Sequence, residues 1–330
     1  MKKSLISIID GVDKLISDNY CHFFNDKNAL ITFLFHGLFN DESEINRNYV
    51  DPQQGITTNM FRRFIEYYLR NGFIFVSPYD ILNGLETDKN YVLITFDDGY
   101  YNNHLALSIL QEYQVPAIFF ISSNHVLNNK SFWWDVIYRE RVKENIPLEQ
   151  ISKELVKLKH NKNDEIEQYL VDSFGENALT PICDVDRPFT PSELKDLSSD
   201  PLVFLGNHTG NHAILTNLSH SEIKLEIDYS QNFIFNLTGI MPIMIAYPNG
   251  NFSEEVLNIS QKAGLKLGIT TNPKKNLLPI NLKGLHPFAL NRFILWGNKN
   301  IEQQCGAFRS DIQFSNFVRK LWTSKEQVSL

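Results

Sequence analysis

Two adjacent carboxylates and two spaced histidines are the residues of this sequence whose types and spacing could do chemistry. Asp97 and Asp98 stand side by side before Gly99, and His208 and His212 stand four residues apart. On a helical turn that spacing puts both imidazoles on one face, as a shared metal ion requires. With one of the carboxylates they would form a two-histidine, one-carboxylate site, which suits catalytic zinc and also accepts iron and other first-row metals.

The segments that precede these residues indicate how they are positioned. Residues 91–96 and 202–205 are apolar or β-branched and read as buried strands. A strand interior could not hold two unpaired carboxylates, because burying them is costly or forces protonation. At the end of a strand both can turn into the mouth of an α/β fold, where ligands usually bind. Taken alone, Asp-Asp-Gly could be a surface turn and His-x-x-x-His is a weak signal; the joint pattern is much stronger.

The rest of the chain alternates between strand and helix patterns. This alternation predicts an α/β fold with a parallel sheet covered by helices, and the count of seven or eight strands suits a deformed (β/α)7-8 barrel. We expect one catalytic domain over residues 1–330. The further strands are expected at residues 29–35, 73–76, 115–121, 243–247, 266–270 and 290–295, and the helices at 60–70, 103–113, 221–235 and 253–263.

Residues 130–190 differ from the rest of the chain in composition and in hydrophobic pattern. The segment is charged, carries a helical pattern and lacks strand signals, and it opens with the aromatic run Phe-Trp-Trp at residues 132–134. We interpret it as a helical insertion within the domain that caps the mouth of the barrel. The aromatic residues could stack on a ligand, but we expect them chiefly to pack the insertion onto the barrel.

Composition excludes several classes of protein. The chain has 330 residues, of which 43% are hydrophobic and 21% charged, which is ordinary globular material. A net charge of -7 and the lack of any basic run argue against a nucleic-acid groove. Three widely spaced cysteines, an odd number, indicate neither a disulfide framework nor a cysteine-based zinc site; they are Cys21, Cys183 and Cys305.

The beginning of the sequence bears on location. An apolar run at residues 5–9 is interrupted by Asp10 and Asp13, which makes it too short for a signal peptide or a membrane span. We therefore expect a cytoplasmic protein without an integral membrane segment, and peripheral membrane contact stays open. The sequence leaves the oligomeric state unknown.

Four segments together resemble a known family, the polysaccharide deacetylases (carbohydrate esterase family 4). Residues 95–99 (Thr-Phe-Asp-Asp-Gly) and 208–212 (His-Thr-Gly-Asn-His) resemble its first two motifs, residues 110–121 resemble the segment after the first motif, and residues 245–250 resemble the third motif. The resemblance spans most of the chain except the insertion and the tail beyond about residue 297. It implies a deformed barrel of the deacetylase type, a divalent metal and hydrolysis of an N-acylated amino sugar.

Carried over residue by residue, the resemblance assigns Asp98, His208 and His212 as metal ligands and Asp97 as the general base. Zinc is the expected metal, with iron, cobalt or nickel as alternatives. Water attacks the acyl group at the metal while Asp97 takes its proton. The charge of the ion supports this division, because it keeps Asp98 ionised and lowers the pKa of Asp97.

The third motif and a general acid complete the implied mechanism. The backbone N–H of Asn249 is the natural donor to the oxyanion, because Pro248 has none. An amine is a poor leaving group, so an acid must protonate it. The commonest pattern of the family places a late histidine in Leu-x-x-x-His, which His286 fits in letters, but His286 precedes a proline and lies ahead of the last strand. A permuted branch, which includes biofilm-polysaccharide deacetylases, carries the acid on the first strand, and we therefore favour His36.

One family residue is missing. The arginine expected just before the proline of the third motif is absent, and Ala246 occupies its place. Arg292, at the start of the last strand, could orient Asp97 instead. A structural salt bridge is an equally good account of Arg292.

We therefore expect a metal-dependent carbohydrate deacetylase. The expected cytoplasmic location suggests a nucleotide- or lipid-linked precursor of a surface polysaccharide as the substrate. A deformylase, an O-acetyl esterase or a non-sugar amidase could use the same site. A non-catalytic carbohydrate-binding relative is a further alternative, although it would not require a free base beside a complete metal triad.

Overall fold

A computed structural model describes residues 12, 15–17, 19 and 28–310. The apolar run at residues 5–9 and Cys21 lie outside these ranges. Among the described residues, no helix combines the length and the apolar character that crossing a bilayer requires.

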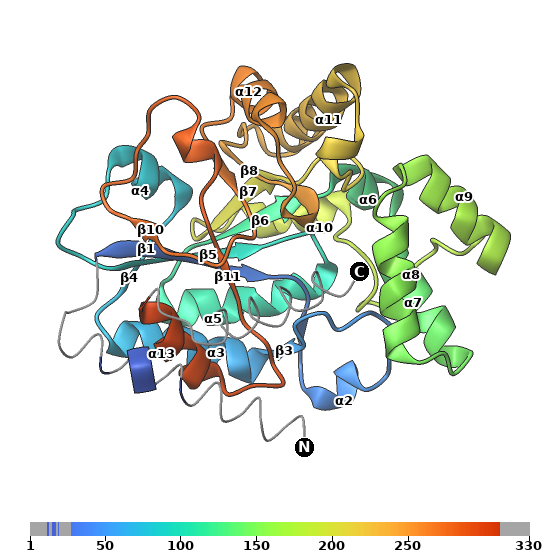
Figure 1. Ribbon diagram of the computed structural model, residues 1–330, viewed down its shortest axis with the longest axis horizontal. Helices are drawn as coiled ribbons and strands as arrows, with labels where there is room; N and C mark the ends of the chain where they lie inside the picture. Colours follow the sequence, from blue (N-terminus) through green and yellow to red (C-terminus); the bar gives the residue numbers. More distant parts are fainter. Residues whose placement is uncertain (1–11, 13–14, 18, 20–27, 311–330) are drawn as a thin grey trace, which may run out of the picture.

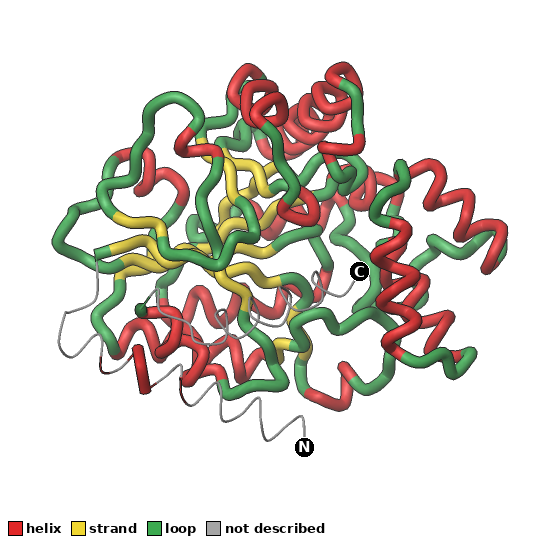
Figure 2. Tube along the Cα trace, viewed as in Figure 1, coloured by secondary structure: helices red, strands yellow, loops and turns green. Residues whose placement is uncertain are grey.

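One curled sheet forms the centre of the molecule (Figures 1 and 2). Its strands follow the order β10-β1-β5-β6-β7-β8-β9, with β4 beside β5 and β11 beside β1, and the neighbours are parallel except β1 and β10. The strands are β1 (Ala29–Phe35), β4 (Ile74–Phe75), β5 (Tyr91–Phe96), β6 (Ala117–Ile121), β7 (Val203–Asn207), β8 (Met244–Ala246), β9 (Leu267–Ile269), β10 (Asn276–Leu277) and β11 (Phe293–Ile294). A separate small sheet pairs β2 (Leu38–Phe39) with β3 (Ile56–Thr57).

The last strand segment connects the two ends of the parallel sheet. Leu290 bridges to Ile269 at the end of β9, and β11 pairs with β1 in parallel register. The sheet therefore curls into an incomplete barrel, which confirms the expected deformed barrel. The predicted strand at 290–295 is shorter than expected, because Arg292 leaves the ladder and turns inward.

Helices cover both sides of the sheet, and their ends follow local sequence signals. In α3 the Thr57 side chain caps the Met60 N–H, and the buried residues Phe61, Phe64 and Tyr68 form one face. Within residues 28–310, the helices outside the insertion are α2 (Glu42–Ile45), α3 (Thr58–Arg70), α4 (Pro78–Asn83), α5 (Leu105–Tyr113), α6 (Ser123–Asn128), α10 (Pro191–Ser198), α11 (His220–Thr238), α12 (Glu254–Lys262) and α13 (Ile301–Arg309).

Five of these helices were not predicted: α2, α4 and α6, which are short, and α10 and α13, of which α10 carried a clear sequence signal. Thr190 caps α10 and Glu193 bonds back to the Thr190 N–H, which is a capping box with Pro191 in the first turn. The Thr-Pro-Ser-Glu run in the sequence is the signature of that motif. The helix α13 packs on α3.

The strands divide their side chains between two cores. Phe33 and Phe35 of β1 pack with Phe96 of β5 against the helices α3 and α5, which lie on one side of the sheet (Figure 1). Leu30 and Leu93 belong to a second cluster, on the inner face of the curl. This alternation decides which residues face the inside where the strands end.

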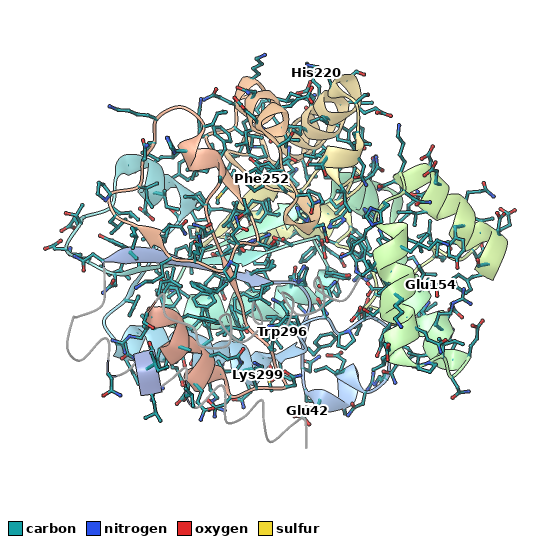
Figure 3. The ribbon with its side chains drawn as sticks, viewed as in Figure 1. Glu42, Glu154, His220, Phe252, Trp296 and Lys299 are labelled. Atoms are coloured by element: carbon teal, nitrogen blue, oxygen red, sulfur yellow. The ribbon has the colours of Figure 1, made fainter. Side chains whose placement is uncertain are left out.

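The insertion, all of which the structure describes, contains three helices and no strand. They are α7 (Trp133–Lys143), α8 (Leu148–Leu158) and α9 (Asn163–Phe174), coloured green at one side of the barrel in Figure 1. They share an apolar cluster of their own that includes Phe132 and Tyr100. Glu154 of α8, labelled in Figure 3, accepts hydrogen bonds from Arg141 of α7. The predicted helical segment is thus helical throughout most of its length.

Candidate active site and metal centre

The register of the sheet brings His36 and Asp97 together. Phe35 of β1 is the parallel partner of Phe96 of β5, so the next residues, His36 and Asp97, are neighbours at the carboxyl ends of the strands. The Asp97 N–H donates to the Phe35 carbonyl at 2.9 Å, which continues the ladder by one step. Both residues line one cavity of about 420 Å³.

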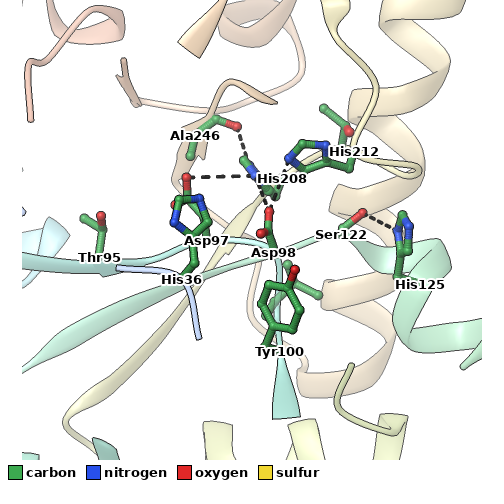
Figure 4. Close-up of polar contacts among 12 residues, drawn as sticks. His36, Thr95, Asp97, Asp98, Tyr100, Ser122, His125, His208, His212 and Ala246 are labelled. Atoms are coloured by element: carbon green, nitrogen blue, oxygen red, sulfur yellow. Dashed lines mark hydrogen bonds and ion pairs between the residues drawn. The ribbon is translucent and has the colours of Figure 1, made fainter. Parts of the chain in front are cut away.

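Asp98, His208 and His212 converge in the same cavity (Figure 4). One nitrogen or oxygen atom from each lies within 4.8 Å of the others. Nε2 of each histidine is 3.2 Å from the same oxygen, Oδ1 of Asp98. Asp98 and His208 are each 1% exposed, and the His212 side chain is 14% exposed.

The surroundings of these three residues fit a bound cation. Among the described residues, no hydrogen-bond donor other than the two imidazoles approaches the buried Asp98 carboxylate. His208 Nδ1 lies 2.8 Å from the Ala246 carbonyl oxygen, which can only accept, so Nδ1 carries the hydrogen and Nε2 presents its lone pair. The lone pair of His208 Nε2 and the carboxylate oxygen Oδ1 of Asp98 therefore face each other at 3.2 Å, which is unfavourable unless a cation lies between them.

Burial and the two histidines act in opposite directions on Asp98. Burial raises its pKa, but the contacts with His208 and His212 outweigh burial and hold the pKa well below its usual range. A carboxylate that stays ionised while buried is the form that binds a metal ion.

The two histidines reach their positions through a loop. The sequence favoured a helical turn for residues 208–212, but these residues follow β7 without helical structure. Thr209 and His212 instead have left-handed backbones, with φ of 65° and 53°, and so does Asp98 with φ of 75°. Such conformations cost about 1–3 kcal/mol each and cluster at functional sites.

Arg292 forms a bidentate ion pair with the Asp97 carboxylate. Nη1 donates to Oδ1 and Nη2 to Oδ2, each at 2.6 Å, and Nε donates to the Thr270 carbonyl at 3.0 Å. Burial raises the pKa of Asp97, but the charge of Arg292 leads the opposing interactions, and the pKa falls below its ordinary value. The predicted contact is present, and its geometry fits both a positioning role and a structural ion pair.

The two candidate acids lie in different surroundings. His36 lines the cavity, whereas His286 begins the short 3-10 helix η4 (His286–Phe288), is exposed and does not line the cavity. Asn249 lines the cavity in the turn η3 (Pro248–Gly250) with a left-handed φ of 58°. Its side-chain oxygen accepts a hydrogen bond from Lys159 of the insertion at 2.7 Å.

The insertion supplies the opposite wall of the cavity. Trp134 lies over His212, with ring centroids 4.6 Å apart, and its Nε1–H donates to the Tyr100 hydroxyl at 2.8 Å. That hydroxyl donates to Asp135 at 2.7 Å, and Asp135 also accepts from the Asp51 N–H at 2.9 Å. The aromatic residues therefore pack the insertion onto the site, and a buried chain of hydrogen bonds ties it to the loop at Asp51.

Several cavity residues were not identified from the sequence. They come from loops or from polar and exposed positions of the insertion, which no motif marks. Asp51, Gln53, Ser152, Val156, Lys159 and Asn161 are among them.

Comparisons with known proteins agree with the motifs. A family model described as polysaccharide deacetylase matches residues 84–268, a range that holds both carboxylates, both histidines and Asn249 but neither His36 nor Arg292. YxkH of Bacillus subtilis (strain 168), whose name places it among the polysaccharide deacetylases, is 22% identical over 218 residues. The match covers 64% of this chain and 57% of YxkH, so the chain spans little more than half the length of that relative.

Solved structures share the fold. The Streptococcus pyogenes deacetylase PplD, in complex with acetate, aligns with a TM-score of 0.56 and 17% identity over 85% of this chain and 98% of its own. A de-N-acetylase from Aggregatibacter actinomycetemcomitans aligns with a TM-score of 0.57 and 14% identity over 85% and 100%. At these identities the likeness establishes the fold. Because the family model covers more than half of its residues, the chain belongs to the polysaccharide deacetylase family.

Proposed function

We propose that this chain is a metal-dependent deacetylase that removes an N-acetyl or other N-acyl group from an amino sugar, within a polysaccharide or its precursor. The observation that carries the proposal is the convergence of Asp98, His208 and His212 beside the ionised Asp97 in one cavity. A general base next to a complete set of metal ligands suits hydrolysis better than binding alone.

Asp98, His208 and His212 would hold a divalent ion, for which we propose zinc. When bound, such an ion polarises the acyl carbonyl and lowers the pKa of water at the site. The hydrogen bond from His208 Nδ1 to Ala246 orients the first imidazole for this role.

The remaining groups move protons. Asp97 accepts a proton from the attacking water, and Arg292 holds both of its oxygens in place. As the C–O bond forms and the C–N bond breaks, His36 gives a proton to the leaving nitrogen, so the products are a carboxylic acid and a free amine. The backbone N–H of Asn249 supports the oxyanion formed on the way.

Metal content and amine release, measured on the same samples, test the proposal. We expect near-stoichiometric metal and amine release from N-acetyl sugars in the wild type, and loss of both in His208→Ala. His220→Ala is the matched control, because His220 lies on the surface with a 63% exposed side chain paired to Glu255. It should retain both.

The substrate panel separates the rival activities. N-formyl sugars, O-acetyl sugars and non-sugar amides are scored beside the N-acetyl sugars. Turnover of esters alone, or of non-sugar amides alone, would move the proposal to another acyl group. A wild type that binds no metal after reconstitution would contradict the mechanism, and one that binds acylated sugar unchanged would be a binding module.

A further inference from the structure

Gln54 has an amide whose orientation is fixed by two main-chain groups. It is 5% exposed and lies just before β3. Its Nε2 donates to the Leu34 carbonyl at 2.6 Å, and its Oε1 accepts from the His36 N–H at 2.9 Å. Turning the amide over would place donor against donor and acceptor against acceptor, so the oxygen must face His36.

This oxygen also determines where the His36 ring carries its hydrogen. Nδ1 of His36 lies 3.1 Å from Oε1 of Gln54. Because an amide oxygen can only accept, Nδ1 must carry the hydrogen, and the lone pair of the neutral ring lies on Nε2. Among the described residues, Nε2 has no hydrogen-bond partner, and His36 lines the cavity that holds Asp97 and Asp98.

The surrounding backbone holds both residues in place. The Gln54 carbonyl accepts from the Gly297 N–H at 2.7 Å, and a Cβ at position 297 would lie 1.9 Å from the Gly55 carbonyl oxygen. Asn103 Nδ2 donates to the His36 carbonyl at 2.6 Å. The main chain of His36 is therefore fixed, and the Gln54 amide cannot shift without breaking a buried contact, which is the rigidity that a positioned proton donor needs.

We infer that Gln54 is the positioning residue of the general acid: it holds His36 with a permanent Nδ1–H, so that the proton for the leaving amine comes from Nε2. The inference rests on the proposed function. In the step, the imidazolium loses its Nε2 proton to the leaving nitrogen as the C–N bond breaks, and the other hydrogen stays on Nδ1, where it donates to Gln54 Oε1. The charged groups facing the ring are the carboxylates of Asp51, Asp97 and Asp98.

Nitrogen NMR tests the tautomer without reference to turnover. The zinc-loaded protein, labelled with ¹⁵N-histidine, is observed above the pH at which the ring is protonated, and His36→Gln identifies the His36 signals among nine histidines. We expect the wild type to show the Nδ1–H tautomer. Gln54→Met, which keeps the length of the side chain but replaces the amide oxygen with a weakly accepting thioether, should shift His36 toward the Nε2–H form that a free imidazole prefers.

Steady-state kinetics test whether His36 needs the Nδ1–H tautomer to act as the general acid. We expect Gln54→Met to lower kcat about tenfold, a fraction of the 10²–10⁴ that acid catalysis typically supplies, with KM unchanged. Gln54→Glu restores the acceptor for Nδ1–H and stabilises the imidazolium by its charge, but it sets a second oxygen against the Leu34 carbonyl, so its unfolding is measured beside its kinetics. Because the acid must be protonated, this variant should recover kcat and extend activity to higher pH.

Two results would overturn the inference: an Nε2–H tautomer in the wild type, or an unchanged kcat and pH profile in folded Gln54→Met. If that variant fails to fold, the wild-type spectrum and Gln54→Glu still decide. A wild type that releases no amine from any sugar would overturn the proposed function and with it the acid role of His36, whereas the NMR measurement would still decide which tautomer Gln54 holds.

Discussion

The two walls of the cavity are built in opposite ways. The strand-end wall carries Asp97, Asp98, His208 and Arg292, which are 3% exposed or less and engaged by one another. The insertion wall combines the buried Trp133 and Trp134 with exposed side chains such as Val156, which is 57% exposed. Buried groups that depend on one another tolerate little change, whereas exposed ones can vary with little cost to folding. We therefore interpret the first wall as the source of the chemistry and the second as the surface that contacts the rest of the substrate.

Among the substitutions that test this contrast, the largest loss of stability and activity is expected at Arg292. In Arg292→Gln the Asp97 carboxylate loses its buried partner, so the free energy of unfolding should fall by about 3–5 kcal/mol, the usual cost of breaking a buried ion pair. Without the guanidinium the pKa of Asp97 rises, and because the base must be ionised, the acid limb of kcat/KM should move to higher pH. Denaturant unfolding and pH–rate profiles measure the two effects.

The pH dependence of the free energy of unfolding provides a second test of the same prediction. The lowered pKa of Asp97 contributes stability above its unfolded value of about 3.9, and this stability is lost as pH falls through the folded pKa. Arg292→Gln should therefore lose stability mainly at neutral pH, and the gap to wild type should narrow in acid. Arg63→Gln is the control, because its exposed pair with Glu302 should contribute less than about 1 kcal/mol. Equal effects at the two arginines would remove the distinction between buried and exposed ion pairs, on which the comparison depends.

An intermediate effect is expected where the walls meet, at Trp134. Trp134→Phe keeps an aromatic ring over His212 but removes the Nε1–H that bonds to the Tyr100 hydroxyl. We expect a loss of about 1 kcal/mol in unfolding free energy, typical of one hydrogen bond, with kcat changed only a few-fold. Thermal unfolding and steady-state kinetics provide the measurement, with Trp133→Phe as the matched substitution. A loss of kcat of about 10²-fold with metal retained would place Trp134 among the chemical groups, where a single acid or base contributes at least as much.

The smallest effect is expected at Lys159. Lys159→Met removes the hydrogen bond to Asn249 and one positive charge from the insertion wall. Because exposed charges contribute about 0.2–1 kcal/mol, KM should change less than about tenfold while kcat stays constant. Lys153→Met is the control, because Lys153 lies within α8, the helix that ends just before Lys159, and is 74% exposed and paired with Glu149. A large fall in kcat at Lys159 would show that this wall takes part in the chemical step.

The features predicted correctly from the sequence are those that short segments determine. An apolar strand followed at once by Asp97 and Asp98 needs no distant information, because the end of the strand itself directs the side chains to the cavity. The barrel followed from the alternation of strands and helices, whose boundaries differ from the predicted ones by a few residues.

Features that depend on tertiary contacts were predicted less well. The helical turn expected for His208 and His212 is a loop, since left-handed residues there depend on packing around the site. Gln54 is one of two adjacent glutamines, and only the fold distinguishes the one that meets His36 from the one that does not. The role of Asp135 likewise arises from a partner 84 residues away, Asp51.

That bond between Asp135 and the Asp51 backbone has a consequence for protein engineering. It couples the insertion to the loop of residues 51–54, so the two segments must be exchanged together, although more than seventy residues of chain separate them. A chimaera that exchanges only residues 130–190 with a relative would leave the Asp51 N–H and the Tyr100 hydroxyl without their acceptor. Recombination that aims at a new sugar specificity should therefore transfer both segments and Tyr100 together.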